Sequence, residues 1–255
     1  MIDTHSHIYG EEFDLDREQV IERALEQGLE KIVLANVDND SLPRIIKTCE
    51  EYPSICIPTI GLHPTSVDDN FQSNLDTLFN SIDICKWFAI GEIGLDLYWD
   101  TKYREQQIIA FEQQIEIALR MNLPVIVHIR NAFEDLHNVM SKYKNRNLSG
   151  VIHSFSGDVN DVDLIKSFGN FYFGINGIVT FKKSELKELI PIIGIENIIL
   201  ETDSPYLSPV PYRGKRNESS YVVKIAEEIA RTLDISLEEV NRITTKNAEF
   251  LFSLT

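Results

Sequence analysis

Cysteines, basic residues and long apolar runs are all scarce in this chain, and each scarcity excludes a class of protein. The only cysteines are Cys49, Cys56 and Cys85, and no two of them have C-x-x-C spacing. This pattern predicts reduced packing residues rather than a disulfide framework, and it favours a cytoplasmic protein. No apolar run approaches the roughly 18 residues that a membrane-spanning helix needs. The N-terminal region is acidic and polar by residue 11, which predicts that there is no signal peptide.

Basic charge is the most marked deficit. The 255 residues contain 24 Lys and Arg against 40 Asp and Glu, a net charge of −16. A protein that coats nucleic acid draws its affinity from neutralising phosphates, so this balance argues against that class. It leaves open an enzyme with a local basic mouth, or one in which bound metal ions supply the positive charge.

Short apolar runs alternate with longer segments of helical period, which is typical of βα units. The predicted strands cover residues 2–5, 31–36, 54–60, 88–92, 124–128, 151–153, 171–175 and 198–202. The clearest helical segments are 16–27, 104–121, 220–233 and 236–252. The last of these opens with the capping-box spacing of Ser236 and Glu239.

Eight such units predict an α/β protein, a single (β/α)8 TIM barrel with an extra C-terminal helix, formed by residues 1–255 as one domain. The alternative is an open doubly wound sheet, but no G-x-G-x-x-G follows the first strand to support a dinucleotide site. The Pro-rich, basic range 204–220 indicates a long loop rather than a linker.

The histidines cluster at the carboxyl ends of the predicted strands, where active sites of this fold lie. Five of the six histidines are at such ends, namely His5, His7, His63, His128 and His153. The sixth, His137, lies in a helical segment, where we expect it to face solvent. Glu92 and Asp203 end two further strands. Chance placement is a poor explanation for this distribution.

The polar set predicts a metal site. Imidazole together with carboxylate suits Zn, Mn, Fe, Co or Ni and, less naturally, Mg. The expected ligands are His5, His7, Glu92, His128, His153 and Asp203. Six ligands exceed what one catalytic tetrahedral ion takes, so we expect two ions bridged by Glu92. Asp203 would join His5 and His7 and could also act as general base.

Seven motifs spread over the whole chain carry a resemblance to a known family. They are "DTHSH", "IGLHP", "IGEIGLD", "PVIVHIR", "IHSFSG", "ILETDSPYLSP" and "YRGKRNE". In their order and spacing the chain resembles the TatD family of metal-dependent deoxyribonucleases, a branch of the amidohydrolase superfamily.

The resemblance implies a 3′→5′ exonuclease-like activity on DNA, expected to be single-stranded, in a cytoplasmic protein that we expect to be a monomer. We expect two divalent ions among Zn, Mg, Mn and Ni, no organic cofactor and no membrane partner. The resemblance also implies the same six ligands that the strand ends select. Glu92 stands where many amidohydrolases carry a carbamylated lysine. The resemblance marks His63 as an active-site residue near the scissile phosphate, so the implied catalytic set is Asp203, Glu92 and His63. The alternative for His63 is a turn-stabilising role before Pro64.

Other residues are candidates for substrate binding. Arg130 lies two positions after His128 and could hold a phosphate, or instead form a surface ion pair. Arg213, Lys215 and Arg216 form a basic loop that could attract a phosphate backbone. After this loop the chain has Ser219 and Ser220 where the family usually has Pro and Ala, a departure that keeps helix initiation possible.

Three residues near the end of the fourth strand have weaker predictions. Asp96 could orient a ligand imidazole. Tyr98 and Trp99 could offer a stacking face to a base, or pack at the rim of the barrel.

Three functional hypotheses follow. The first is a metal-dependent deoxyribonuclease. The second is a hydrolase of the same architecture that acts on a small amide, ester or lactone, because such folds share metals and differ in loops. The third is a non-catalytic metal-bound scaffold, against which the carboxylate of Asp203 argues.

Overall fold

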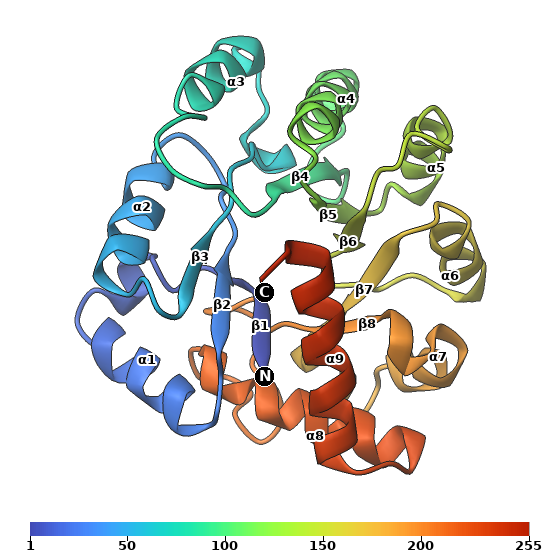
Figure 1. The fold of residues 1–255 in the computed structure, drawn as a ribbon. Helices are drawn as coiled ribbons and strands as arrows, with labels where there is room; N and C mark the ends of the chain where they lie inside the picture. Colours follow the sequence, from blue (N-terminus) through green and yellow to red (C-terminus); the bar gives the residue numbers. More distant parts are fainter. Residues whose placement is uncertain (255) are drawn as a thin grey trace.

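Eight parallel strands alternate with helices in the computed structural model, which describes residues 1–254 (Figure 1). The strands are β1 Ile2–Ser6, β2 Lys31–Leu34, β3 Cys56–Pro58, β4 Ile90–Asp96, β5 Val125–Arg130, β6 Gly150–Ile152, β7 Phe171–Ile175 and β8 Ile198–Leu200. The α-helices within these residues are α1 Arg17–Glu26, α2 Leu42–Glu51, α3 Phe71–Phe79, α4 Arg104–Met121, α5 Phe133–Ser141, α6 Val159–Lys166, α7 Leu186–Ile193, α8 Val222–Leu233 and α9 Leu237–Phe252. Among these helices, none combines the length and apolar character that crossing a bilayer requires.

The strands lie side by side in chain order. β1 to β3 form one sheet and β4 to β8 form a second. Isolated bridges connect the two sheets at both seams, Ile60 with Ile90 and Ser6 with Ser204. Because the strands follow one another around this ring with the helices outside it, the architecture is the (β/α)8 barrel that the sequence predicts, with α9 as the extra C-terminal helix.

The helices form because their apolar residues recur on one face. In α1 the buried residues are Val20, Ile21 and Ala24, which pack toward the strands. The predicted segment 104–121 coincides with α4. At the start of α9, the Ser236 hydroxyl accepts a hydrogen bond from the Glu239 backbone N–H, which is half of the predicted capping box.

One end of the barrel is closed by an apolar cluster that we call the barrel floor. It contains Ile2, Val33, Ile57, Ala89, Ile126, Val151 and Ile199 from the strands and their N-terminal flanks, and Ala248, Leu251 and Phe252 from α9. Figure 1 shows α9 running across this end of the ring, close to the start of β1. Since the floor is filled with apolar side chains, a site for polar chemistry is expected at the opposite, carboxyl end.

A buried carboxylate fastens the seam between the first and last strands. Asp3 of β1 accepts hydrogen bonds from the Thr202 backbone N–H at 2.8 Å and from the Thr202 hydroxyl at 2.7 Å. Burial raises the pKa of the Asp3 carboxyl to about 7, although the hydrogen bonds from Thr202 oppose this shift. These contacts fix the backbone immediately before Asp203.

Several predicted strand limits were wrong by a few residues. The fourth strand was predicted to end at Glu92, but β4 continues to Asp96 because Leu95 and Asp96 pair with Ile129 and Arg130 of β5. A polar residue that faces the mouth of a barrel resembles a strand end in the sequence, although the backbone remains paired. The predicted third strand, 54–60, shortens to Cys56–Pro58, and Ile60 keeps only its isolated bridge.

Candidate metal centre

All six predicted ligands meet at the carboxyl end of the barrel. His5 lies in β1 and His7 follows that strand; Glu92 and His128 lie in β4 and β5. His153 comes directly after β6, and Asp203 three residues after β8. Parallel strands of a barrel bring their carboxyl ends to one face, which explains how residues nearly 200 positions apart converge.

Glu92 is the centre of this group. Its Oε2 lies 3.1 Å from His5 Nε2 and 4.0 Å from His7 Nε2. Its Oε1 lies 2.9 Å from His128 Nδ1 and 3.7 Å from His153 Nε2. The two oxygens of one carboxylate therefore face two different histidine pairs, which is the placement that a bridging ligand needs.

Asp203 completes the side of the site formed by the first strand. Its Oδ1 lies 3.4 Å from His7 Nε2, 3.8 Å from His5 Nε2 and 3.9 Å from His153 Nε2. The Asp203 N–H donates to the His5 carbonyl at 2.9 Å, which holds the residue against β1. The ligand atoms of His5, His7 and Asp203 all lie within 4.8 Å of one another, and so do those of His5, Glu92 and His153.

Hydrogen bonds on the far side of two rings select the nitrogen that faces the site. His7 Nδ1 lies 3.1 Å from the Ala35 carbonyl, which can only accept, so Nδ1 carries the proton and Nε2 presents its lone pair. His128 Nε2 donates to Asp96 Oδ2 at 2.9 Å, which leaves Nδ1 as the atom that can bind a metal. This contact is the one predicted for Asp96.

Glu201 plays the corresponding part for His153, and sequence reasoning missed it. Its Oε1 lies 3.1 Å from His153 Nδ1 and accepts a hydrogen bond from the Ser154 backbone N–H at 2.6 Å. The contact between Glu201 Oε1 and His153 Nδ1 is an ion pair. A Cβ at Gly174 would overlap the Glu201 carboxylate, so a glycine is needed there to leave room. The feature of the sequence that could have identified Glu201 is its position at the end of the predicted eighth strand.

The electrostatics of the site favour bound cations. Burial alone would raise the pKa of Glu92, but His5, His63 and His153 outweigh it and hold that pKa well below its usual value. Burial lowers the pKa of His5 and of His63. Burial also acts to lower the pKa of His153, but Glu201 and Glu92 outweigh it and raise that pKa to about 10.

His63 enters the same site from the loop after β3. Its Nδ1 accepts the Thr65 backbone N–H at 3.1 Å, so Nε2 carries the proton, and Nε2 lies 3.4 Å from Glu92 Oε1. In this tautomer the ring is a hydrogen-bond donor to the site rather than a ligand. The turn-stabilising and active-site interpretations are therefore compatible, because the two nitrogens do different things.

The site opens into a cavity of about 360 Å³. The residues that line it are His7, Tyr9, Gly10, Glu12, Val37, Ser41, His63, Thr65, Glu92, His128, His153, Asp203, Pro205 and Tyr206. Sequence reasoning missed Tyr9 and Tyr206, since nothing in their spacing separates them from core aromatics. The lining includes no Lys or Arg side chain, and the cationic partners of Glu92 and Asp203 are imidazoles.

The predicted basic residues are not part of this lining. The Arg216 guanidinium pairs with both carboxylate oxygens of Asp16, at 2.6 and 2.8 Å. Arg213 is exposed and lies over the Phe181 ring, and Lys215 is also exposed. Arg216 therefore forms an ion pair with Asp16, the residue that precedes α1, instead of facing the metal site. Substrate binding by Arg213 and Lys215 stays a prediction.

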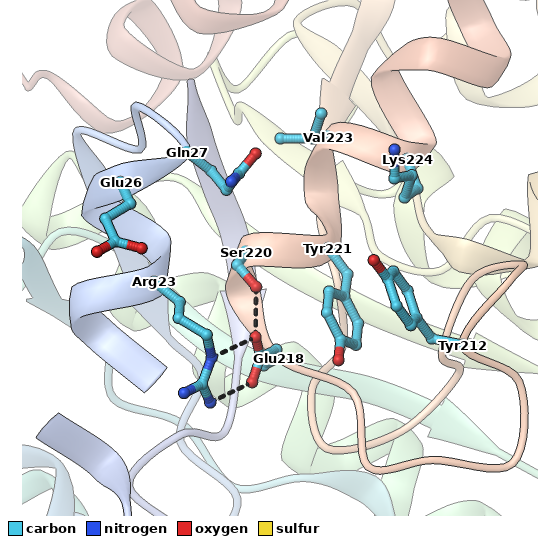
Figure 2. A pocket seen from close by; sticks show the side chains of 9 residues that line it. All are labelled: Arg23, Glu26, Gln27, Tyr212, Glu218, Ser220, Tyr221, Val223 and Lys224. Carbon is cyan, nitrogen blue, oxygen red and sulfur yellow. Dashed lines mark hydrogen bonds and ion pairs between the residues drawn. The ribbon is translucent and has the colours of Figure 1, made fainter. Parts of the chain in front are cut away.

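The basic loop is anchored beside a second cavity, of about 540 Å³, between α1 and the start of α8 (Figure 2). Glu218 accepts two hydrogen bonds from Arg23, at 2.9 and 2.6 Å, and one from the Ser220 hydroxyl. The rings of Tyr212 and Tyr221 stack with their centroids 3.9 Å apart. The ion pair between Arg23 and Glu218 joins the segment that follows the basic loop to α1.

The donor set of the main site fits divalent metal ions. It brings together four imidazoles and two carboxylates, a combination that suits transition metals. The fit rests on two observations: among residues 1–254 neither Glu92 nor Asp203 has a Lys or Arg partner, and support from Ala35 and Asp96 directs ring nitrogens inward. Buried carboxylates that are paired only with imidazoles suit a bound metal ion.

Comparisons with known proteins agree with this geometry. The sequence model of the TatD related DNase family matches residues 2–253. The chain is 38% identical over 255 residues to the uncharacterized metal-dependent hydrolase YabD of Bacillus subtilis, covering 100% of this chain and 99% of that protein. It is 30% identical over 263 residues to the 3′-5′ ssDNA/RNA exonuclease TatD of Edwardsiella piscicida, with 100% of both chains covered.

Among solved structures, the TatD homolog YJJV of Escherichia coli superposes with a TM-score of 0.92 at 26% identity, covering 100% of this chain and 98% of that one. The fold, the converging ligands and the match of nearly the whole chain agree with one another. The chain therefore belongs to the TatD related DNase family, and it is an enzyme of the metal-dependent hydrolase class.

Proposed function

We propose that this protein is a deoxyribonuclease that hydrolyses phosphodiester bonds of single-stranded DNA in the 3′→5′ direction with two divalent metal ions. The observation that carries the proposal is the position of Glu92, whose two oxygens face separate histidine pairs in a member of the TatD family. The 30% identical exonuclease from Edwardsiella piscicida supports the choice of nucleic acid as substrate.

The ligands divide into two groups around Glu92. His5, His7 and Asp203 would hold one ion, and His128 and His153 the other, with Glu92 shared. Divalent ions bound there supply Lewis acidity, which makes water more acidic and neutralises charge on a phosphodiester.

The chain supplies the proton transfer and the orientation. Asp203 is the general base: as the water oxygen bonds to phosphorus, a proton of the water passes to the Asp203 carboxylate. The P–O ester bond breaks at the same centre, and the sugar oxygen leaves with the bonding electrons and takes a proton from solvent. His63 Nε2–H donates a hydrogen bond to a non-bridging phosphate oxygen, since its Nδ1 is occupied by Thr65. Asp96 and the Ala35 carbonyl keep the rings of His128 and His7 in register.

We further propose that the whole chain acts as one catalytic unit, as a monomer in the cytoplasm. The support for the compartment is the cysteines: Cys49, Cys56 and Cys85 are all free within the described residues, as expected for a reducing environment.

The test is a time course on 5′-end-labelled single-stranded DNA with Mg, Mn and Zn compared. We expect a ladder that shortens from the 3′ end. Asp203→Asn should lower kcat by roughly 10²- to 10⁴-fold, because the proton acceptor is lost. Asp83→Asn is the matched control, since Asp83 is exposed and remote from the site, and it should retain activity. Equal rates for Asp203→Asn and the wild type would refute the assigned base.

A small-molecule hydrolase is the second candidate. The observation in its favour is the size of the main cavity, about 360 Å³, which is within the range typical of small-ligand sites. A panel of small amides, esters and lactones, assayed beside DNA with the same metal-loaded protein, separates the two candidates. Turnover of a small carbonyl substrate without cleavage of DNA would replace the nuclease proposal.

A further inference from the structure

Three side chains just outside the metal centre form an exposed cluster, which we call the rim cluster. It consists of Tyr98 and Trp99, which follow β4, and Arg130, the last residue of β5. Asp96 and Arg130 are register partners in the sheet, and Asp96 also accepts the hydrogen bond from His128. The rim cluster therefore lies next to Asp96, the residue that orients the His128 ring.

The aromatic rings of the cluster are turned toward solvent. Trp99 is 73% exposed and Tyr98 is 50% exposed. Their rings meet edge to face, with centroids 4.9 Å apart. Two large aromatic side chains that stay exposed contribute little hydrophobic stabilisation to the fold. An exposed aromatic patch of this kind is typical of a ligand-binding surface.

Arg130 lies flat on this surface. Its guanidinium carbon is 3.6 Å from the Tyr98 ring centroid and 5.4 Å from that of Trp99. Over residues 1–254 no carboxylate oxygen lies within 4.0 Å of the guanidinium, so the predicted close surface ion pair does not form. The charge of Arg130 still acts on its neighbour: burial would raise the pKa of Asp96, but His128 and, to a smaller extent, Arg130 lower it. Stacking occupies the face of the guanidinium and leaves its N–H edge free, which is the edge that binds phosphate.

The position of the cluster relative to the chemistry is set by a chain of contacts. Glu92 Oε1 lies 2.9 Å from His128 Nδ1, and His128 Nε2 donates to Asp96 Oδ2 at 2.9 Å. The Tyr98 backbone N–H donates to the other Asp96 oxygen at 3.0 Å. These contacts connect the start of the rim cluster to the metal centre through only two side chains, His128 and Asp96.

We propose that Tyr98, Trp99 and Arg130 form a nucleotide subsite, in which a base adjacent to the scissile phosphate stacks on Trp99 and Tyr98 and its phosphate is held by Arg130. The proposal rests on the proposed function and names the substrate class more narrowly. A base in a duplex is already stacked and paired, so an open aromatic platform selects single strands.

The chain permits a direct spectroscopic test. It has two tryptophans, and the other, Trp87, is buried with its indole N–H bonded to the Ile82 carbonyl. The metal-loaded enzyme is titrated with a phosphorothioate oligothymidylate, which resists cleavage. We expect tryptophan emission to be quenched in the wild type, and this quenching to disappear in Trp99→Phe, in which Trp87 alone emits.

Steady-state kinetics on single-stranded DNA give the second measurement. Trp99→Ala should raise KM by roughly 5- to 150-fold, the range expected for loss of one base stack, while kcat changes by less than about twofold. Arg130→Ala should raise KM as well, and Arg130→Lys should recover only part of it. Phe250→Ala is the matched control, because Phe250 is 74% exposed but lies on α9 at the floor end of the barrel. Its KM should equal that of the wild type.

An abasic substrate adds a test that a structural role would not pass. An oligonucleotide that lacks the base next to the cleaved bond should raise KM for the wild type but not further for Trp99→Ala. Two results together would refute the subsite and leave the nuclease proposal standing: Trp99→Ala cleaves DNA with the KM of the wild type, and the oligothymidylate does not quench the tryptophan emission of the wild type. Failure to cleave DNA with Mg, Mn or Zn would refute the nuclease proposal, and the subsite with it.

Discussion

The barrel floor makes a prediction that one pair of substitutions can test. Phe252 and Phe250 lie two residues apart on α9, but Phe252 is 1% exposed and packs in the floor cluster, whereas Phe250 is 74% exposed. The two side chains are chemically identical and share one helix. Truncating each side chain to Ala therefore compares the same substitution on the same helix at a buried and at an exposed position.

The expected magnitudes follow from burial. Phe252→Ala removes a ring from a packed apolar cluster and should lower the free energy of unfolding by roughly 3–5 kcal/mol. In a chain of this length that corresponds to a fall in Tm of roughly 6–20 °C. Phe250→Ala should change the free energy of unfolding by less than about 0.5 kcal/mol, as is usual for surface sites.

The assay is urea unfolding followed by circular dichroism, on both variants and the wild type, with metal removed. A difference between the two variants of less than about 1.5 kcal/mol, below the range for loss of a buried ring, would refute the reasoning that α9 closes the floor. Metal affinity provides a further check, because the metal centre lies at the other end of the barrel. We expect Phe252→Ala to retain the affinity of the wild type.

Two further predictions concern charge. Metal affinity should rise with pH by about tenfold per unit for each proton displaced, because the pKa of His153 is raised to about 10 and the metal must displace that proton below this pH. Chelator competition at about pH 6 and pH 8 checks this, and equal affinities would contradict it. Arg23→Ala removes the cationic partner of the buried Glu218 carboxylate. It should lower the free energy of unfolding, measured in urea, by roughly 1–3 kcal/mol. The exposed pair of Arg242 with Glu239 is the control, and Arg242→Ala should cost less than about 1 kcal/mol.

The fold was predictable because each βα unit has a local sequence pattern: a short apolar run followed by a segment of helical period. All eight predicted strands exist, and the segment 104–121 is helical from end to end. The predicted metal ligands converge because strand ends of a barrel share one face, so position along the strand already implies position in space. His137, predicted to lie outside this group, is exposed on α5.

Pairings between distant segments were not predictable. Arg216 resembles a free cation in the sequence, because its partner Asp16 lies 200 positions earlier. Glu201 was overlooked because its target, His153 Nδ1, lies in a distant part of the sequence, directly after β6. The end of β4 was misplaced since Glu92 and Asp96 are polar in an otherwise apolar strand, and only the pairing of residues 93–96 with β5 shows that the strand continues.

The distribution of the ligands along the chain has a consequence for folding. His5 is among the first residues made, whereas Asp203 lies about four-fifths of the way along the 255 residues. The proposed two-ion site takes ligands from both the first and the last strand, so no fragment that lacks either strand contains the full set. We therefore expect tight uptake of metal to follow the closing of the last strand against the first. Such long-range closure is slow to form. Metal content can therefore serve as a measure of the fraction of molecules that have completed the barrel, and the bound ions should act as a clamp that disfavours partly opened states.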